Sequence, residues 1–360
     1  MEVAEVPAPS REPVLVMMSG GVDSSVAAAL LLDAGHEVVG VTMKLWGGPS
    51  DTGCCAVSDV DDARRVADRL GIEHHVFNFG EDFERDVVGP YVGDHAAGRT
   101  PNPCIECNRY LKFDRLVRRA DALGFDRIAT GHHARVIDTP GGPRLARGVD
   151  GAKDQSYVLH VIDESVLRRL FLPVGAMTKA DVRAIATDLD LRTATKPESQ
   201  DVCFITNEHG RKSFLGDRIP LRSARVQDSE GKELGSVSSV ELVTIGQRKG
   251  LGLAGGSDPR YVVDVDAAPG RQPVVTVGEK ADLAVDLTPL ESWRWVGEAL
   301  DDTDLSFQCS AHGSPAPGRV VHGGVEWAAP HRKIALGQSV VAYDAHGCVV
   351  GGGIADRLPI

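Results

Sequence analysis

Two separated cysteine motifs carry the residues of this chain best suited to covalent chemistry. Cys104 and Cys107 form a C-x-x-C in the segment TPNPCIECN, where prolines restrict a turn and a helix is expected to begin. A helix N-terminus favours the thiolate, so we expect the pKa of these thiols to be lowered and their reactivity raised. Cys203, in ESQDVCF, lies where the first domain is expected to end. Two such distant cysteines could meet across a cleft.

The remaining cysteines are weaker candidates. Cys54 and Cys55 are adjacent and not spaced as metal ligands, and Cys309 and Cys348 lie in runs typical of buried strands, so we assign them no role. A second C-x-x-C or a histidine pair at ligand spacing is not evident, which disfavours zinc. Without an export signal a disulfide scaffold is also not expected, and we place the chain in the cytoplasm with no membrane partner.

A glycine loop, Ser19–Ser25 (SGGVDSS), follows the apolar run PVLVMM and precedes the helical pattern VAAALLLDAG. Backbone amides and the dipole of the helix favour an anion at such a position, and glycines let the backbone approach it closely. Asp23 could hold Mg²⁺ against pyrophosphate. The loop has neither the Gly-Lys-Ser/Thr of a P-loop nor the GxGxxG of a dinucleotide fold. It resembles instead the PP-loop of the N-type ATP pyrophosphatases, which cleave ATP to AMP and pyrophosphate while adenylating an oxygen.

Strand-like and helix-like segments alternate around these motifs, which predicts an α/β fold with a parallel sheet covered by helices on both faces. Further along, glycines multiply and short alternating runs such as SVELVTI and RYVVDVD indicate strands. We expect three domains: a PP-loop catalytic domain at 1–204, a small β-rich central domain at 205–288, and a C-terminal β-barrel at 289–360.

The net charge of -12 argues against nucleic acid as a partner, because phosphates are held chiefly by Lys and Arg. A local basic face can still bind RNA. Directly after Cys107, four basic residues recur at helical spacing and are expected to form one face beside the nucleophile: Arg109, Lys112, Arg115 and Arg119. Further basic pairs are Arg211-Lys212, Arg248-Lys249 and Arg332-Lys333.

The ordered motifs resemble those of the bacterial tRNA-specific 2-thiouridylases. The matching segments are MSGGVDSS, GRTPNPCIECN with LKF, ATGHHAR, KDQSYVL, DVCFI, TIGQRKGLGL and YVVDVD, with a weaker echo in GQSVVAY and GGGI. The resemblance implies a sulfurtransferase that adenylates the C2 oxygen of a wobble uridine with ATP and Mg²⁺ and replaces it with sulfur. It also implies the tRNAs for lysine, glutamate and glutamine as substrates and a cysteine desulfurase or sulfur-relay protein as partner. We expect a monomer.

The resemblance also implies roles for individual residues. Cys107 would be the nucleophile and Cys203 the persulfide carrier. The implied ATP-binding residues are Met17, Met18, Ser19, Gly20, Gly21, Val22, Asp23, Ser24, Met43 and Gly131. The implied tRNA-binding residues are Asn102, Pro103, Cys104, His132, Lys153, Asp154, Gln155 and Gln338.

This chain departs from its relatives at two places. Cys104 stands where many relatives have an aspartate, so an acid or base role of that carboxylate does not transfer. Ser310-Ala311-His312 stands where relatives often carry Arg-Tyr-Arg against tRNA, so that contact is not expected here.

The chemistry explains why both motifs are needed. Oxide is a poor leaving group, and adenylation converts the oxygen into AMP. A persulfide on Cys203 then supplies sulfur, either after Cys107 attacks it and releases sulfide, or by direct attack with Cys107 resolving afterwards. The sequence leaves both routes open.

Three alternatives remain. The chain could be another PP-loop adenylating ligase, an iron–sulfur-dependent tRNA thiolase using Cys104, Cys107 and Cys203, or a metal-bearing RNA-binding module with a vestigial ATP site.

Overall fold

A computed structural model describes residues 13–45, 57–197, 202–205, 210–253, 258–268, 270–300 and 304–357. The chain divides into two compact units. The first consists of residues 1–87, 103–206 and 346–349, and the second of residues 88–102, 207–345 and 350–360. We describe each unit separately.

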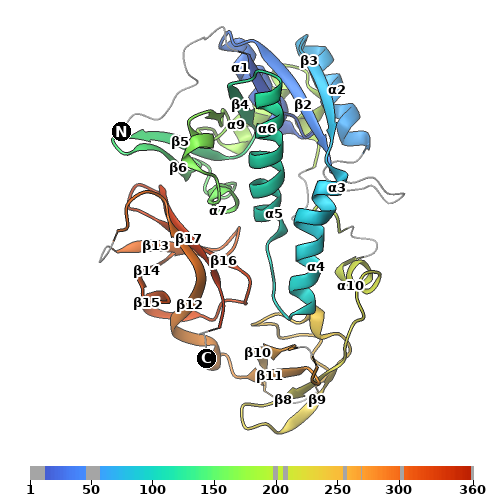
Figure 1. The fold of residues 1–360 in the computed structure, drawn as a ribbon, viewed down its shortest axis with the longest axis vertical. Coiled ribbons are helices and arrows are strands. Elements are labelled where there is room, and N and C mark those ends of the chain that lie inside the picture. The colour runs from blue at the N-terminus through green and yellow to red at the C-terminus, as the bar shows by residue number, and fades with distance from the viewer. Residues whose placement is uncertain are drawn as a thin grey trace. The chain divides into compact units, whose positions relative to one another are not determined.

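The first unit is built on a five-stranded parallel sheet, as the sequence predicted (Figure 1). Its strand order is β3-β2-β1-β4-β7. Strands β1 and β2 are buried over almost their whole length, which explains their continuous valine-rich sequences. The strands are β1 (Val14–Met17), β2 (Val38–Lys44), β3 (Glu73–Asn78), β4 (Arg127–Thr130) and β7 (Leu170–Phe171).

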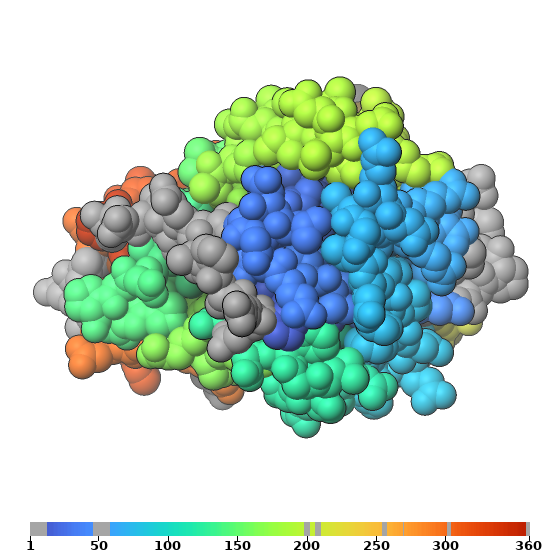
Figure 2. All heavy atoms as spheres, turned by 90° about the horizontal axis from the view of Figure 1, so that it is seen from above, coloured from blue at the N-terminus to red at the C-terminus, as the bar shows by residue number. Residues whose placement is uncertain are grey.

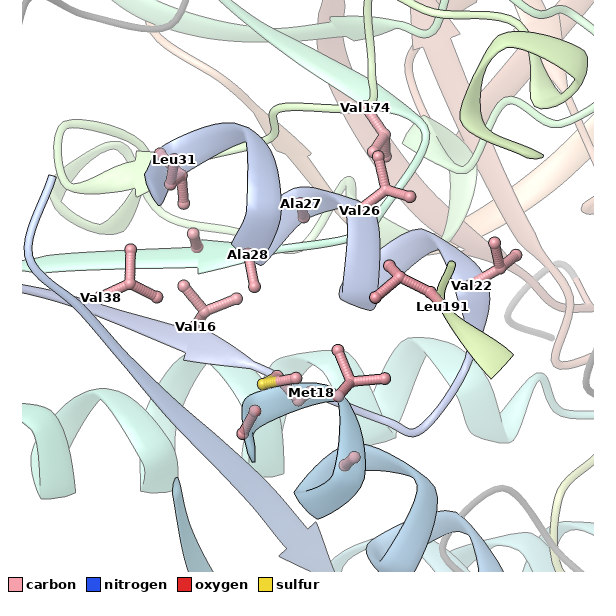
Figure 3. Close-up of a cluster of buried hydrophobic side chains, with 14 of the residues drawn as sticks. Val16, Met18, Val22, Val26, Ala27, Ala28, Leu31, Val38, Val174 and Leu191 are labelled. Atoms are coloured by element: carbon pink, nitrogen blue, oxygen red, sulfur yellow. The ribbon is translucent and has the colours of Figure 1, made fainter. Parts of the chain in front are cut away.

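Three helices share one hydrophobic core with the sheet. They are α1 (Val22–Asp33), α2 (Val57–Leu70) and α9 (Lys179–Asp188). Val26, Ala27 and Leu31 of α1 meet Val16 and Val38 of the strands in this core (Figure 3). Figure 2 shows the yellow-green atoms of the α9 region against the dark-blue atoms of the α1 region. This packing fixes α9 against α1.

The rest of the first unit consists of short elements that carry most of the sequence motifs. A π-helix, η2, contains Cys107 as its first residue. The elements are α3 (Gly80–Phe83), η1 (Glu84–Val88, which ends at the unit boundary), α5 (Pro103–Glu106), η2 (Cys107–Arg115), α6 (Leu116–Ala122), β5 (Ala134–Thr139), β6 (Gly142–Arg147), α7 (Ser156–Leu159), α8 (Glu164–Leu167) and η3 (Arg192–Thr195).

The second unit contains the two β-rich parts that the sequence predicted. A mixed sheet has the order β10-β11-β8-β9, and a closed antiparallel barrel has the order β12-β15-β14-β13-β16-β17. The helical elements are α4 (Gly89–Ala96), α10 (Gly210–Gly216), η4 (Val240–Leu242) and η5 (Ala281–Leu283). The strands are β8 (Ala224–Gln227), β9 (Glu233–Val237), β10 (Tyr261–Asp266), β11 (Val274–Gly278), β12 (Ala284–Trp295), β13 (Leu305–Gln308), β14 (Ala316–Val321), β15 (Gly324–Arg332), β16 (Ser339–Tyr343) and β17 (Val349–Ala355).

The prediction of a strand at SVELVTI was wrong, because this segment contains the 3₁₀ turn η4. The carboxylate of Glu241, 2% exposed, accepts hydrogen bonds from the backbone amide and the Nε of Arg222 at 2.9 to 3.3 Å. A buried carboxylate satisfied in this way fixes a turn where alternation alone favoured a strand. Among the described residues, no helix is long and apolar enough to cross a membrane.

Candidate active site

The glycine loop occupies the predicted position between β1 and the N-terminus of α1. Gly20 has a φ of 71°, and a Cβ on it would lie 2.2 Å from the carbonyl oxygen of Asp59. Lys196 donates to the Gly20 carbonyl at 3.0 Å and pairs with Asp59 at 2.6 Å and Asp62 at 2.7 Å. Only glycine fits this position, and the lysine fixes the loop against α2.

Hydroxyl groups hold the loop from within. Ser24 Oγ accepts from the Ser19 amide at 3.1 Å and lies within hydrogen-bonding distance of the Gly21 carbonyl, as does Ser25 Oγ. Met18 and Val22 are 2% and 5% exposed and point into the core (Figure 3), so any contact they make with a nucleotide would come from the backbone. These hydrogen bonds fix the backbone conformation of the loop.

Gly131 closes the other side of the loop. It follows β4, and a Cβ at this position would lie 2.4 Å from the amide nitrogen of Ser24. Met43, 8% exposed, lies near the C-terminal end of β2 in the same parallel sheet. The ends of β1, β2 and β4 thus bring Met17, Met43 and Gly131 to one edge of the sheet, where ligands bind in open α/β folds.

Asp23, in the first turn of α1, is held by two cationic or donor groups. Lys179 Nζ lies 2.7 Å from both carboxylate oxygens, and His133 Nε2 lies 3.1 Å from Oδ1. Burial by itself would raise the pKa of Asp23, but hydrogen bonds from His133 and Lys179 outweigh it and hold the pKa below its usual value. Asp23 is therefore an anion with a resident lysine counter-ion.

His132 connects the loop after β4 to the helix that carries Cys107. Lys112 Nζ lies 3.2 Å from its Nε2, and Thr130 Oγ1 lies 2.7 Å from its Nδ1. An ammonium can only donate, so Nε2 accepts from Lys112 and the proton of the neutral ring is on Nδ1. Burial lowers the pKa of His132, and the charge of Lys112 lowers it further. Lys112 thus connects η2 to the loop after β4.

The three motif cysteines lie in the first unit. The C-x-x-C lies at the start of a helix, as predicted: α5 begins at Pro103, half-buried Cys104 lies in its first turn, and Cys107 is 9% exposed at the start of η2. Asn108 Nδ2 donates to the Val158 carbonyl of α7 at 2.9 Å, which ties the KDQSYVL segment to this helix. All five cysteines that the structure describes are thiols.

Cys203 is half-buried, and its neighbour Phe204 anchors the segment 202–205. The Phe204 ring packs edge-on against Phe83 of α3 at a centroid distance of 5.6 Å. Asp82 of the same helix pairs with Arg115 of η2 at 3.4 Å. The chain around Cys203 is therefore attached to an element that contacts the Cys107 helix. Cys54, Cys55 and residues 198–201 of the ESQDVCF motif lie outside the described residues.

The basic residues after Cys107 do not form the single face expected from helical spacing. In a π-helix the i→i+5 hydrogen bonds widen each turn, so residues three or four apart diverge. Lys112 contacts His132, Arg115 pairs with Asp82, Asp86 and Asp114, and the Arg119 guanidinium lies 5.2 Å from the centre of the Phe77 ring. Arg109 lies 3.8 Å from Glu106. Much of this charge is neutralised within the unit.

The KDQ segment is a folded loop. Asp154, whose side chain is 3% exposed, accepts from the amides of Gly148 and Ser156 and from Arg147. Gln155 Oε1 accepts from the His133 amide at 2.8 Å, and its own amide donates to the His133 carbonyl at 2.9 Å. Lys153 is half-buried in the same loop. Asp154 and Gln155 therefore shape the loop and position His133.

Asn102 and Gln338 belong to the second unit. Gln338 Nε2 donates to the Thr100 carbonyl, and Arg99 pairs with Asp356 at 2.8 Å and with Glu291 at 2.5 Å. Both contacts fix the segment before Asn102 to the barrel.

Among the described residues, no group of three His, Cys, Asp or Glu side chains is arranged to hold a metal ion. Cys104, Cys107 and Cys203 are all described, so they do not form such a group here. Asp23 fits the different case of Mg²⁺, which proteins commonly bind through one or two carboxylates together with phosphates of the substrate.

Sequence reasoning missed Lys179, His133 and Lys196. His133 was visible as the second histidine of ATGHHAR, and Lys179 follows a helix-capping threonine in MTKAD. Their partners Asp23 and Gly20 are far away in sequence, and no spacing rule connects them.

Comparison with known proteins shows the family of the chain. A family model described as "tRNA methyl transferase HUP domain" matches residues 12–207, and one described as "tRNA methyl transferase PRC-barrel domain" matches residues 212–279. The tRNA-specific 2-thiouridylase MnmA of Carboxydothermus hydrogenoformans is 46% identical over 97% of this chain and 99% of its own length. Proteins with the same name from a Mycobacterium species and from Chloroflexus aggregans are 46% and 44% identical over 92% and 95% of this chain, and over 94% and 98% of their own lengths. The chain belongs to the family of tRNA-specific 2-thiouridylases.

Proposed function

We propose that this protein is a tRNA-uridine 2-sulfurtransferase that uses ATP to activate the C2 oxygen of a wobble uridine. One observation supports this most directly: Gly131 packs on the nucleotide loop while the adjacent His132 contacts Lys112 of the Cys107 helix. These two contacts connect the proposed nucleotide site to the helix of the proposed nucleophile within one unit. Adenylation followed by sulfur transfer needs these two sites side by side.

The glycine loop would hold ATP through backbone amides at the N-terminus of α1. The proposed contacts come from Met17, Met18, Ser19, Gly20, Gly21, Val22, Asp23, Ser24, Met43 and Gly131. Mg²⁺ bound near Asp23 would neutralise the departing pyrophosphate. The uridine oxygen attacks the α-phosphorus, pyrophosphate leaves, and the C2 position becomes electrophilic with AMP as its leaving group.

Sulfur would arrive on Cys203 as a persulfide delivered by a cysteine desulfurase or a relay protein. In one route the Cys107 thiolate attacks the inner sulfur of Cys203, a Cys107–Cys203 disulfide forms, and the expelled sulfide displaces AMP from C2. In the other route the terminal sulfur attacks C2 first, AMP leaves, and Cys107 then releases the thiolated base with the same disulfide. An external thiol reductant restores both thiols.

The tRNA would be contacted by residues near these thiols and on the barrel. We propose Asn102, Pro103, Cys104, His132, Lys153, Asp154, Gln155 and Gln338, with Asp154 and Gln155 acting through the loop that they shape. The tRNAs for lysine, glutamate and glutamine are the proposed substrates, which would place the enzyme in the cytoplasm. We retain the proposed domain limits of 1–204, 205–288 and 289–360.

Methyl transfer, the reaction in the family model's description, is a different class of chemistry. It requires neither an adenylating loop nor two thiols in separate motifs, and the PP-loop geometry gives it no role for Asp23. Thiolation through an iron–sulfur cluster on Cys104, Cys107 and Cys203 remains the alternative closest in chemistry, although these thiols do not form a ligand group here.

The decisive experiment measures 2-thiouridine in digested tRNA after reaction with ATP and a persulfide donor. Cys107→Ala and Cys203→Ala should each abolish the product, while tRNA-dependent release of pyrophosphate, which precedes sulfur transfer, persists. Cys309→Ala is the matched control, because burial raises the pKa of the Cys309 thiol to about 12 and leaves it unreactive. Undiminished thiolation by Cys203→Ala would refute the carrier role, and iron bound in proportion to activity would favour the cluster route.

A further inference from the structure

We propose that Lys179 is an exchangeable counter-ion of the nucleotide loop: it neutralises Asp23 in the free enzyme and moves to the pyrophosphate of ATP when Mg²⁺ binds at Asp23. The inference rests on the proposed function, because it concerns the ATP site of that reaction. It adds a phosphate-binding residue that the glycine-loop motif does not contain.

Lys179 and Asp23 form a close, largely buried ion pair. Lys179 Nζ lies 2.7 Å from each oxygen of Asp23, and the lysine side chain is 12% exposed. His133 Nε2 adds a third contact to Oδ1 at 3.1 Å. A carboxylate so occupied offers little negative charge to a free metal ion, because an ammonium at this distance repels a divalent cation strongly.

The backbone of Lys179 is fixed at the start of α9. Lys179 is the first residue of α9, where Thr178 and Asp181 form a reciprocal capping box. The Lys179 amide also donates to Asp150 Oδ2 at 3.0 Å. The flexible stem of lysine therefore pivots from a fixed point at the edge of the loop.

The other lysine that contacts the loop, Lys196, has different partners. Lys196 donates a hydrogen bond to the Gly20 carbonyl and pairs with the carboxylates of Asp59 and Asp62. It supports the backbone of the loop. Lys179 has an acidic partner that lies inside the phosphate-binding motif itself, and that partner is the carboxylate suited to Mg²⁺. When the metal takes over Asp23, the ammonium is left beside the newly bound phosphates, whose oxygens are strong acceptors for it.

The exchange predicts that replacing Lys179 raises the affinity for a divalent metal ion and lowers the affinity for ATP. Without nucleotide, Lys179→Met should bind Mn²⁺, used as a spectroscopic substitute for Mg²⁺, about tenfold more tightly than wild type, because a nearby like charge is gone. The same variant should bind ATP about 10- to 100-fold more weakly, because a charged phosphate contact is lost. A purely structural lysine would weaken both or neither.

The experiment titrates Mn²⁺ by electron paramagnetic resonance and ATP by calorimetry, on the full chain. Lys179→Arg keeps the charge and should retain weak Mn²⁺ binding, and Lys232→Met, at an exposed turn of the second unit, should match wild type in both titrations. The wild type alone gives a test that needs no variant: its Mn²⁺ affinity should rise sharply when inorganic pyrophosphate is added.

Tight Mn²⁺ binding without pyrophosphate, or parallel losses in Lys179→Met with an unchanged melting temperature, would overturn the exchange. If wild type binds ATP as described but forms no 2-thiouridine, the proposed function fails and the exchange stands.

Discussion

Gly131 lies against the first turn of α1 so closely that a Cβ on it would sit 2.4 Å from the amide nitrogen of Ser24. The same position would be 2.5 Å from the carbonyl carbon of Asp23. These are backbone atoms of a helix start, which cannot yield as a flexible side chain would. The loop after β4 thus fixes the amides that are proposed to bind phosphate.

Gly131→Ala should therefore push the glycine loop away from its binding geometry. We expect a loss of stability of about 1–3 kcal/mol from overpacking and a raised KM for ATP. Gly93→Ala is the matched control, because a Cβ there meets no atom within 4 Å and alanine favours the helix. Chemical unfolding and AMP-formation kinetics measure the two effects, and equal behaviour of both variants would contradict the close packing.

The parallel sheet, the glycine loop and the helix start at the C-x-x-C followed from sequence because each depends on local pattern. Valine-rich runs, a glycine cluster between strand and helix, and a proline-restricted turn before a helix are all short-range signals. The contact between Lys179 and Asp23 depends on how α9 packs on α1, and no sequence spacing encodes that packing.

The expected basic face after Cys107 shows where a prediction from local spacing fails. Its spacing matched an α-helix, and the structure has a π-helix from Cys107 to Arg115. The wider turn and the carboxylates of α3 and η1 redirect Arg115 into ion pairs. The alternating pattern of SVELVTI likewise predicted a strand that does not form, because the buried Glu241 carboxylate accepts hydrogen bonds from Arg222 in a 3₁₀ turn.

Lys112→Met should uncouple the thiol helix from the nucleotide loop. We expect the rate of 2-thiouridine formation to fall about 10²-fold, a typical result of removing one fixed donor from a reaction site, while the KM for ATP changes little. Lys112→Arg keeps a donor for His132 Nε2 and should restore part of the rate. Single-turnover assays with persulfide-loaded enzyme measure this, and an unchanged rate in Lys112→Met would exclude the coupling.

His95 should make the second unit sensitive to acid. Its Nδ1 donates to the Glu241 carbonyl at 3.0 Å, and its buried Nε2 has no hydrogen-bond partner in the described part of the chain. Burial first, and then the charge of Arg211, lower the pKa of His95 from 6.5 to about 4. His95 therefore binds a proton more readily in the unfolded chain than in the folded chain. The stabilisation that the neutral, buried His95 gives the folded unit is fully present above pH 6.5, and it is lost as the pH falls toward 4.

The expected loss is roughly 3 kcal/mol of unfolding free energy at the acid end of this range. His95→Asn keeps a donor near the position of Nδ1 and removes the titration, so its stability should depend less on pH. His322→Asn, at an exposed position, should follow wild type. Urea unfolding between pH 7 and about 4 tests this, and parallel curves for His95→Asn and wild type would rule out His95 as the source.

Binding of tRNA should depend strongly on salt through exposed cations, with little contribution from the paired arginines of η2. Arg248 and Lys249 are exposed in the TIGQRKGLG segment, whereas Arg115 is engaged by Asp82 and Asp86. Removing one phosphate contact lowers the slope of log K against log salt by about 1. We expect this change for Arg248→Ala and for Lys249→Ala, while Arg115→Ala lowers the melting temperature and leaves the slope unchanged. Filter binding at several salt concentrations distinguishes the exposed cations from the paired arginine.

A reduced slope for a fully folded Arg115→Ala would restore the η2 face as a tRNA surface. An affinity for tRNA that does not depend on salt would contradict tRNA binding through phosphates altogether.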